Sequence, residues 1–140
     1  MTDGTHYSLS DRVELALWST AAAFQRRREL LSDAYTAPAV AKLLGVSRQN
    51  PHDRLAAKTL LGVRDDGVWK FPAWQFDPDG PDGVIAHLPD VLRALRVTDL
   101  AKVAWLTMPN GELAGKTPLN ALRQGERELV VAMAGTVGQL

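Results

Sequence analysis

Apolar residues recur at intervals of three, four and seven between Asp11 and about Leu31, which is the spacing of one helix face. Ser10 suits the N-cap of this helix, because its hydroxyl can accept a hydrogen bond from a first-turn amide. The opposite face carries three arginines and Glu29. That pattern favours either a solvated helix or one that pairs with its copy in a dimer. The apolar positions are Val13, Leu17, Ala21, Phe24 and Leu31.

A second pattern, after Tyr35, indicates a short helix with defined ends. Thr36 suits its N-cap, and Pro38 is tolerated because first-turn amides lack helical partners. Gly45 is expected to end the helix in the left-handed conformation. An apolar pair, a glycine, an apolar residue and a serine are typical of a helix-turn-helix corner. The residues expected to face inward are Val40, Leu43, Leu44 and, beyond the turn, Val46.

Pro51 decides where the next helix begins. With Ser47 as N-cap, Pro51 would be the fourth helical residue, where its missing N–H and its ring both oppose the helix. With Asn50 as N-cap, Pro51 takes the first helical position, where its fixed φ suits the helix. We favour this second register, which predicts a recognition helix from Pro51 to about Leu60.

A hairpin is predicted directly after that helix. The turn sequence Asp65-Asp66-Gly67 includes a glycine, which adopts positive φ readily. A short hairpin in this position is typical of the wing of a winged helix-turn-helix. We expect the large aromatic side chains around it to fill the core rather than to stack on bases. The β-prone residues on either side of the turn are Leu61, Val63, Val68, Trp69 and Phe71.

The last part of the chain follows a loop, DPDGPDG, at residues 77–83 and predicts a set of short helices. Thr98 suits the N-cap of the second of them. Thr117-Pro118 is a cap followed by proline at the first helical position, and Gly125 ends the helix that they open. Glu126 starts the last helix. The inward-facing residues are Val91, Leu92, Leu95, Leu100, Val103, Ala104, Leu106, Leu119, Leu122, Leu129, Val130 and Met133.

These patterns together predict a mainly α fold in three parts. Residues 1–34 form an N-terminal helix that is a candidate dimerisation element. Residues 35–76 form a helix-turn-helix with a small β-hairpin wing. Residues 84–140 form a C-terminal helical domain.

Composition narrows the classes of function. Sixteen basic and sixteen acidic residues cancel, so attraction to nucleic acid must come from a local patch. Residues 35–76 supply one, with six basic residues against three acidic ones. The chain has no cysteine, no run long enough to span a membrane and no signal peptide at its start. We therefore expect a cytoplasmic protein without disulfides.

Side chains suited to DNA cluster around the start of the predicted recognition helix. Arginine can donate two hydrogen bonds to guanine, and asparagine or glutamine can pair with adenine. Basic residues farther along suit phosphates, which fix position without carrying sequence information. The predicted base-reading residues are Arg48, Gln49, Asn50, His52 and Arg54, and the predicted phosphate contacts are Lys58, Arg64 and Lys70.

Catalytic chemistry is not indicated. The histidines His6, His52 and His87 lie far apart and lack the spacing of metal ligands. The aspartates after Phe76 begin like a calcium loop, but position twelve is Leu88 rather than glutamate, which favours a solvated linker. No phosphate-binding loop or nucleophile motif is present. We expect no metal, no cofactor and no enzyme activity.

The stretches TAPAVAKLLGVSRQN and LLGVRDDGVWKFPAWQF resemble the winged helix-turn-helix of small bacterial regulators of the excisionase and MerR type. The likeness covers about forty residues and implies a DNA-binding fold.

The C-terminal part is similar to the toxin-binding domain of the Xre/MbcA/ParS antitoxin family. The matching residues include W-L at Trp105, P-N at Pro109, and the run G-K-T-P-L at Gly115 to Leu119, followed by A-L-R and G-E. The resemblance implies an antitoxin that neutralises a NAD-consuming toxin of the RES fold and represses its own operon. It implies a toxin-binding surface of Trp105, Asn110, Leu113, Thr117, Pro118, Leu119, Leu122, Arg123 and the C-terminal Leu140.

Two functions of different classes follow. The first is an antitoxin that joins a DNA-binding module to a toxin-neutralising one, with operator DNA and a RES-fold toxin as partners and a homodimer or a larger complex with the toxin as its assembly. It requires an exposed leucine-rich face on the C-terminal helices. The second is a free-standing winged helix-turn-helix regulator whose C-terminal helices dimerise it or sense a ligand.

Overall fold

The computed structural model describes the backbone of residues 9–138 and the side chains of residues 20–138. Its contacts divide the chain into two compact units, Met1–Ser32 and Asp33–Leu140. The first unit contains helix α1, Leu9–Leu30. Because α1 includes Ser10, the prediction of Ser10 as its N-cap is wrong. Phe24, predicted on its apolar face, is 65% exposed, and the side chains of the preceding apolar positions Val13 and Leu17 lie outside the described residues.

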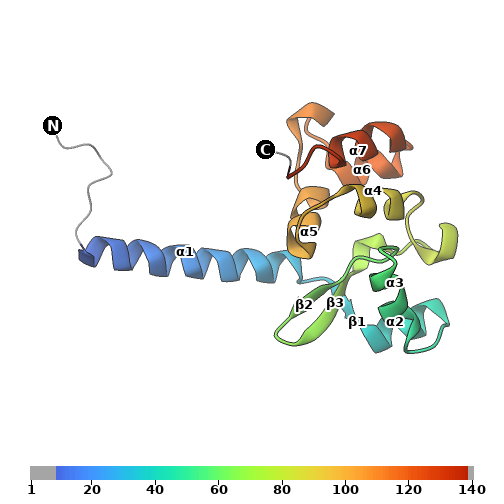
Figure 1. The fold of residues 1–140 in the computed structure, drawn as a ribbon, viewed down its shortest axis with the longest axis horizontal. Helices are drawn as coiled ribbons and strands as arrows, with labels where there is room; N and C mark the ends of the chain where they lie inside the picture. Colours follow the sequence, from blue (N-terminus) through green and yellow to red (C-terminus); the bar gives the residue numbers. More distant parts are fainter. Residues whose placement is uncertain (1–8, 139–140) are drawn as a thin grey trace. The chain divides into compact units, whose positions relative to one another are not determined.

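The second unit is mainly helical and carries a small antiparallel sheet (Figure 1). It opens with strand β1, Ala34–Thr36, and helix α2, Ala37–Leu44. The Thr36 side chain accepts a hydrogen bond from the Ala39 amide at 3.4 Å, which confirms the predicted cap. Gly45 ends α2 with φ 68° and ψ 36°, a conformation that costs glycine little because it has no Cβ.

Two expectations about the core side of α2 are wrong. Leu43 is 51% exposed and Val46 is 37% exposed, whereas Val40 is fully buried. Leu44 is half-buried against the core that Val40 and Phe71 form. The helix is only eight residues long, so its buried face is a narrow stripe, and the turn after Gly45 carries Val46 outward.

Helix α3, Asn50–Ala56, begins one residue before the predicted start and ends well before Leu60. The Asn50 amide donates to the Ser47 carbonyl, so Asn50 already belongs to the helix and its side chain does not cap it. Pro51 is buried in the first turn, where it forfeits no helical hydrogen bond. The helix stops early because Lys58 has a positive φ of 60°.

The predicted hairpin is confirmed as strands β2, Val63–Asp65, and β3, Val68–Pro72. Asp65 pairs with Val68, so the turn consists of two residues, Asp66 and Gly67, and both have positive φ. Such turns match the right-handed twist of paired strands. Strand β1 pairs with the other edge of β3, giving the order β1-β3-β2. This third strand was not predicted.

The aromatic residues around the hairpin pack inward, as expected. Phe71 is fully buried in a cluster with Val40 and Leu60. Trp69 and Phe76 pack against the same cluster, and the ring of Tyr35 lies edge-on to that of Phe76 with centroids 5.8 Å apart. The sheet and the two short helices therefore share one apolar core.

The C-terminal helices are α4, Leu88–Ala94, α5, Asp99–Thr107, α6, Pro118–Arg123, and α7, Arg127–Ala134. The predicted caps Thr98 and Thr117 each accept a first-turn amide hydrogen bond. Helix α6 packs against α5 and α7, and α7 also packs against α4 (Figure 1). Val130 is fully buried, but Leu129, which was predicted to face inward, is 46% exposed.

A buried amide joins the hairpin to the segment that leads into these helices. Gln75 is fully buried in the short 3-10 turn Ala73–Gln75. Its Oε1 accepts from the Leu61 amide at 2.8 Å, and its Nε2 donates to the Leu61 carbonyl at 2.7 Å and to the Pro72 carbonyl at 3.0 Å. The Gln75 carbonyl also accepts from the Ile85 amide at 2.9 Å. The predicted segments 35–76 and 84–140 thus lie in one compact unit, Asp33–Leu140.

Arginines add further links between the two parts of this unit. Arg54 donates to the Asp82 carbonyl at 3.1 Å, and Arg93 donates to the Ala57 carbonyl at 3.3 Å. Hydrogen bonds to charged donors are stronger than neutral ones. The segment after Phe76, predicted as a solvated linker, therefore supplies the acceptor for Arg54 and is held against the rest of the unit.

Replacing the buried amide should destabilise the protein. Gln75→Leu keeps the size of the side chain but leaves the Leu61 N–H and carbonyl buried without partners, which we expect to cost about 3 kcal/mol. Guanidinium denaturation measures this loss. Gln49→Leu, at an exposed position, is the control and should change stability by less than about 0.5 kcal/mol. Equal stability of the two variants would contradict the role of Gln75.

Lys102 provides a second test, because its side chain is only 8% exposed. Burial lowers the pKa of its ammonium below 10.5, although Asp99, 4.0 Å away, opposes the shift, and Lys58 adds repulsion. The folded state therefore carries a penalty below the lowered pKa that disappears as the pH rises towards 10.5. Lys102→Met should raise the melting temperature by about 3 °C at pH 7. The gain should shrink in alkaline buffer, and a gain independent of pH would refute this account.

Candidate nucleic-acid interface

Helix α3 presents two different flanks, because residues four apart lie on the same side of a helix. Gln49 and Asp53 share the exposed flank, and the Gln49 Nε2 donates to the Asp53 Oδ1 at 3.1 Å. His52 is half-buried next to them. This flank therefore carries exposed polar side chains at the start of α3.

The other flank carries Asn50 and Arg54, two residues that were predicted to contact bases. Arg54 is half-buried and its Nη2 is engaged by the Asp82 carbonyl at 3.1 Å. The Oδ1 atom of Asn50 is buried and has no hydrogen-bond partner in the described part of the chain. An unsatisfied buried acceptor costs about 1–3 kcal/mol. A contact of either residue with a base stays a prediction, and it would have to be made beside these intramolecular positions.

The predicted phosphate contacts differ in how available they are. Lys58 is exposed directly after α3, and Arg64 is exposed on β2. Lys70, on β3, is 2.8 Å from the Asp65 carboxylate, which neutralises part of its charge. Arg48 is exposed in the turn before α3. Exposed basic side chains therefore lie at the two ends of α3 and on β2 of the hairpin.

The leucines of the predicted toxin-binding surface are buried within the monomer. Leu119 is 6% exposed, Leu122 is 3% exposed and Leu113 is 4% exposed. Pro118 is buried as well. Since α6 packs against both α5 and α7, its apolar face closes onto the core. The expectation of an exposed leucine-rich face is wrong.

Polar members of the same predicted surface make local structural contacts. The Asn110 side chain accepts a hydrogen bond from the Glu112 amide at 2.9 Å. The Arg123 Nη2 donates to the Trp74 carbonyl at 3.0 Å, which ties α6 to the segment after β3. Trp105 is half-buried, and Leu140 lies outside the described residues.

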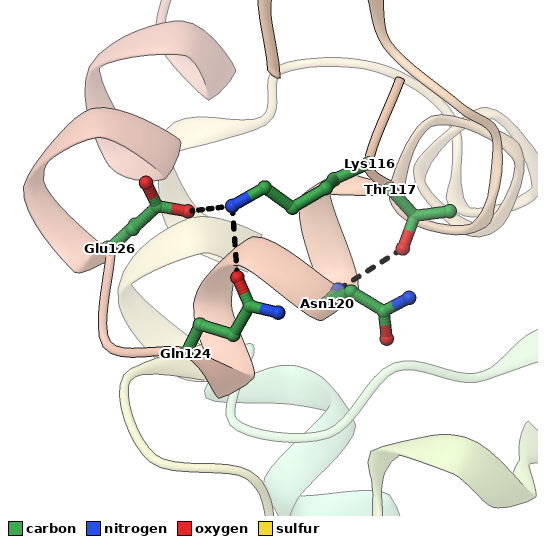
Figure 2. A network of polar contacts seen from close by, with 5 residues as sticks. All are labelled: Lys116, Thr117, Asn120, Gln124 and Glu126. Atoms are coloured by element: carbon green, nitrogen blue, oxygen red, sulfur yellow. Dashed lines mark hydrogen bonds and ion pairs between the residues drawn. The ribbon is translucent and has the colours of Figure 1, made fainter. Parts of the chain in front are cut away.

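Lys116 links the two ends of α6 (Figure 2). Its Nζ lies 2.9 Å from the Gln124 Oε1 and 3.2 Å from the Glu126 Oε2, while the adjacent Thr117 Oγ1 accepts from the Asn120 amide at 3.1 Å. Gly125 follows with φ 86°. The residues that resemble the antitoxin motif thus cap the start of α6, connect its two ends and terminate it.

Within residues 20–138, no group of three or more histidine, aspartate or glutamate side chains is placed to hold a metal ion. Among the helices that the structure describes, none has the length and apolar character needed to cross a bilayer.

Comparison with known proteins gives a structural likeness. No protein-family model matches the chain, and no curated protein matches it. The chain is similar to Rv2175c, whose structure was determined by NMR, with 28% sequence identity and a TM-score of 0.60. The match covers 74% of this chain and 79% of that one. The likeness supports a mainly helical fold with a small sheet.

The capping role of Thr117 predicts a selective effect on stability. Thr117→Ala should cost about 1 kcal/mol, because the Asn120 amide loses its acceptor at the start of α6. Thr117→Ser keeps the hydroxyl and should retain most of the stability. Urea denaturation of the three proteins provides the comparison. If the alanine variant matches the wild type, the hydroxyl does not stabilise α6.

Proposed function

We propose that residues 34–72 form a winged helix-turn-helix and that the protein binds DNA. The observation that carries this proposal is the order β1, α2, α3, β2, β3, with a left-handed Gly45 between the helices and a two-residue hairpin turn after them. A second helix followed by a short hairpin is how such modules place one element in the major groove and another beside the backbone.

In this proposal the exposed flank of α3 enters the major groove. Arg48 and His52 approach base edges, since Asn50 and Arg54 are turned to the other flank. Gln49 can contribute only by releasing its hydrogen bond to Asp53. Base readout therefore depends mainly on Arg48, whose guanidinium matches the two acceptors of guanine.

Electrostatics sets the expected strength of binding. The chain has a formal net charge of zero, so attraction comes from the exposed Arg48, Lys58 and Arg64. Each phosphate neutralised contributes about −0.9 to the slope of log affinity against log salt. Three such contacts correspond to a slope of about −3, which describes modest affinity at physiological salt.

Neutralisation of a RES-fold toxin has less support. It was expected to use an exposed leucine face, and Leu119 and Leu122 are buried. A toxin would have to bind other residues of the C-terminal helices, such as the exposed Met108 and Leu129. These two side chains are single exposed apolar groups of the kind common on protein surfaces. Toxin neutralisation stays a prediction, whereas DNA binding is supported by the arrangement of α2, α3 and the hairpin.

Two substitutions separate base contacts from phosphate contacts. Arg48→Ala should lower affinity for the DNA upstream of the gene about tenfold, with a smaller effect on random DNA. Lys58→Asn should weaken both sequences alike and reduce the salt slope by about 1, and asparagine tolerates the left-handed backbone at this position. Fluorescence anisotropy at 50–200 mM salt measures both effects.

Arg96→Ala is the matched control, because Arg96 is exposed between α4 and α5 and its removal changes net charge equally. It should bind DNA as the wild type does. If all three variants lose affinity to the same extent, net charge alone governs binding and the proposed interface is wrong. If the wild type binds neither DNA, the proposed function is wrong.

A further inference from the structure

A small cavity lies where α3, β3, α4 and α5 meet. Its volume is about 100 Å³, which is room for a few water molecules and well below the size of a site for a drug-sized ligand. All of its walls belong to the unit Asp33–Leu140. The lining combines apolar side chains with three charged ones. They are Leu55, Leu60, Leu61, Trp69 and Leu92, together with Lys58, Asp99 and Lys102.

The amine of Lys102 lies at this cavity without a hydrogen bond. Its ion pair with Asp99 is 4.0 Å long, which is beyond hydrogen-bond distance. Within the described residues, the Asn50 Oδ1 is the one buried side-chain polar atom that is both closed to solvent and unpaired. The Lys102 Nζ is also unpaired there, so it must keep some accessible surface although the side chain is only 8% exposed. A small molecule can therefore reach it.

The surroundings of this nitrogen favour the free amine. Burial lowers the pKa of the Lys102 ammonium below 10.5, Asp99 opposes the shift, and the positive charge of Lys58 adds to it. Only the free amine has a lone pair with which to attack an electrophile. A lysine placed among apolar side chains and beside a second cation is therefore more nucleophilic at neutral or mildly alkaline pH than a solvated one.

Lys58 determines which electrophiles the site attracts. It is exposed directly after α3 and lines the same cavity. A cation beside a nucleophile favours reagents with an anionic leaving group, because Coulomb attraction raises their local concentration. Phosphate can serve as that group and remain in water beside Lys58. The small volume and the apolar walls suit a short acyl chain.

We propose that Lys102 is a nucleophilic lysine that small acyl phosphates, such as acetyl phosphate, acylate. The Nζ lone pair attacks the acyl carbon and forms the C–N bond of an amide. The C–O bond to the phosphate breaks, and the phosphate leaves with its electron pair and takes up the proton that the nitrogen loses. Asp99 stabilises the positive charge that the nitrogen carries before that proton leaves. Acylation of Lys102 is independent of DNA binding by the protein.

Incubation of the full chain with acetyl phosphate near pH 8, followed by peptide mass spectrometry, tests the site. Lys102 should be acetylated at least about fivefold faster than Lys42, an exposed lysine of α2. The rate at Lys102 should rise with pH and level off below pH 10.5, where its amine is fully deprotonated. Acetylation of Lys102 no faster than that of Lys42 overturns the proposal.

Two reagents separate attraction of the phosphate from simple reactivity of the amine. Lys58→Asn removes the cation, and asparagine tolerates the φ of 60° at this position. In this variant the rate at Lys102 should fall at least about fivefold with acetyl phosphate and change less than about twofold with acetic anhydride, which is uncharged. A change in the amount of free amine affects both reagents alike. Equal loss with the two reagents therefore overturns the proposal.

Two controls show whether the fold and the position of the charge are responsible. Lys42→Gln removes one positive charge from an exposed site outside the cavity lining, and Lys102 should react in it as in the wild type. If Lys42→Gln slows the reaction as much as Lys58→Asn does, net charge alone attracts the reagent and the proposal is wrong. In guanidinium chloride, which unfolds the chain, Lys102 and Lys42 should react at equal rates. A preference for Lys102 that persists in the unfolded chain also overturns the proposal.

Discussion

The side-chain amide of Gln75 satisfies both backbone groups of Leu61 and the carbonyl of Pro72 in a site closed to water. An amide is suited to this task because it donates and accepts at once. The backbone carbonyl of Gln75 accepts a hydrogen bond from the Ile85 amide. The base of the hairpin and the segment before α4 are therefore both hydrogen-bonded to Gln75. The hydrogen bonds from Arg54 to the Asp82 carbonyl and from Arg93 to the Ala57 carbonyl add links between α3 and the C-terminal part of the unit.

The fold uses some arginines in hydrogen bonds between distant segments and leaves Arg48 exposed. Arg54, Arg93 and Arg123 each donate to a backbone carbonyl far along the chain, and these hydrogen bonds help to close the unit. Arg48 remains exposed in the turn before α3. Basic residues that lie close together in the sequence around α3 therefore differ in their surroundings in the fold. The proposed interface is smaller and less positive than the count of basic residues indicates.

The run from Gly115 to Gly125 resembles a toxin-binding motif in sequence, but the fold buries its leucines. Its caps and turns are local devices, with Thr117 on the Asn120 amide and Lys116 between Gln124 and Glu126 (Figure 2). The same residues that resemble a toxin-binding motif suffice to build a short, closed helical hairpin. Leu119 and Leu122 lie in the core, so a partner would have to contact the polar residues around them.

The amino-acid sequence determined the local elements of this protein. Caps at Thr36, Thr98 and Thr117, the left-handed Gly45 and the Asp66-Gly67 turn act within four or five residues, so their effect can be predicted from neighbours alone. The tertiary structure decided which side chains remain available. The carbonyls that engage Arg54 and Arg123 lie 28 and 49 residues away, and strand β1 pairs with β3, which follows both α2 and α3 in the chain. Burial of the α6 leucines and the cavity beside Lys102 likewise depend on how separate segments pack, which periodicity along the chain does not specify.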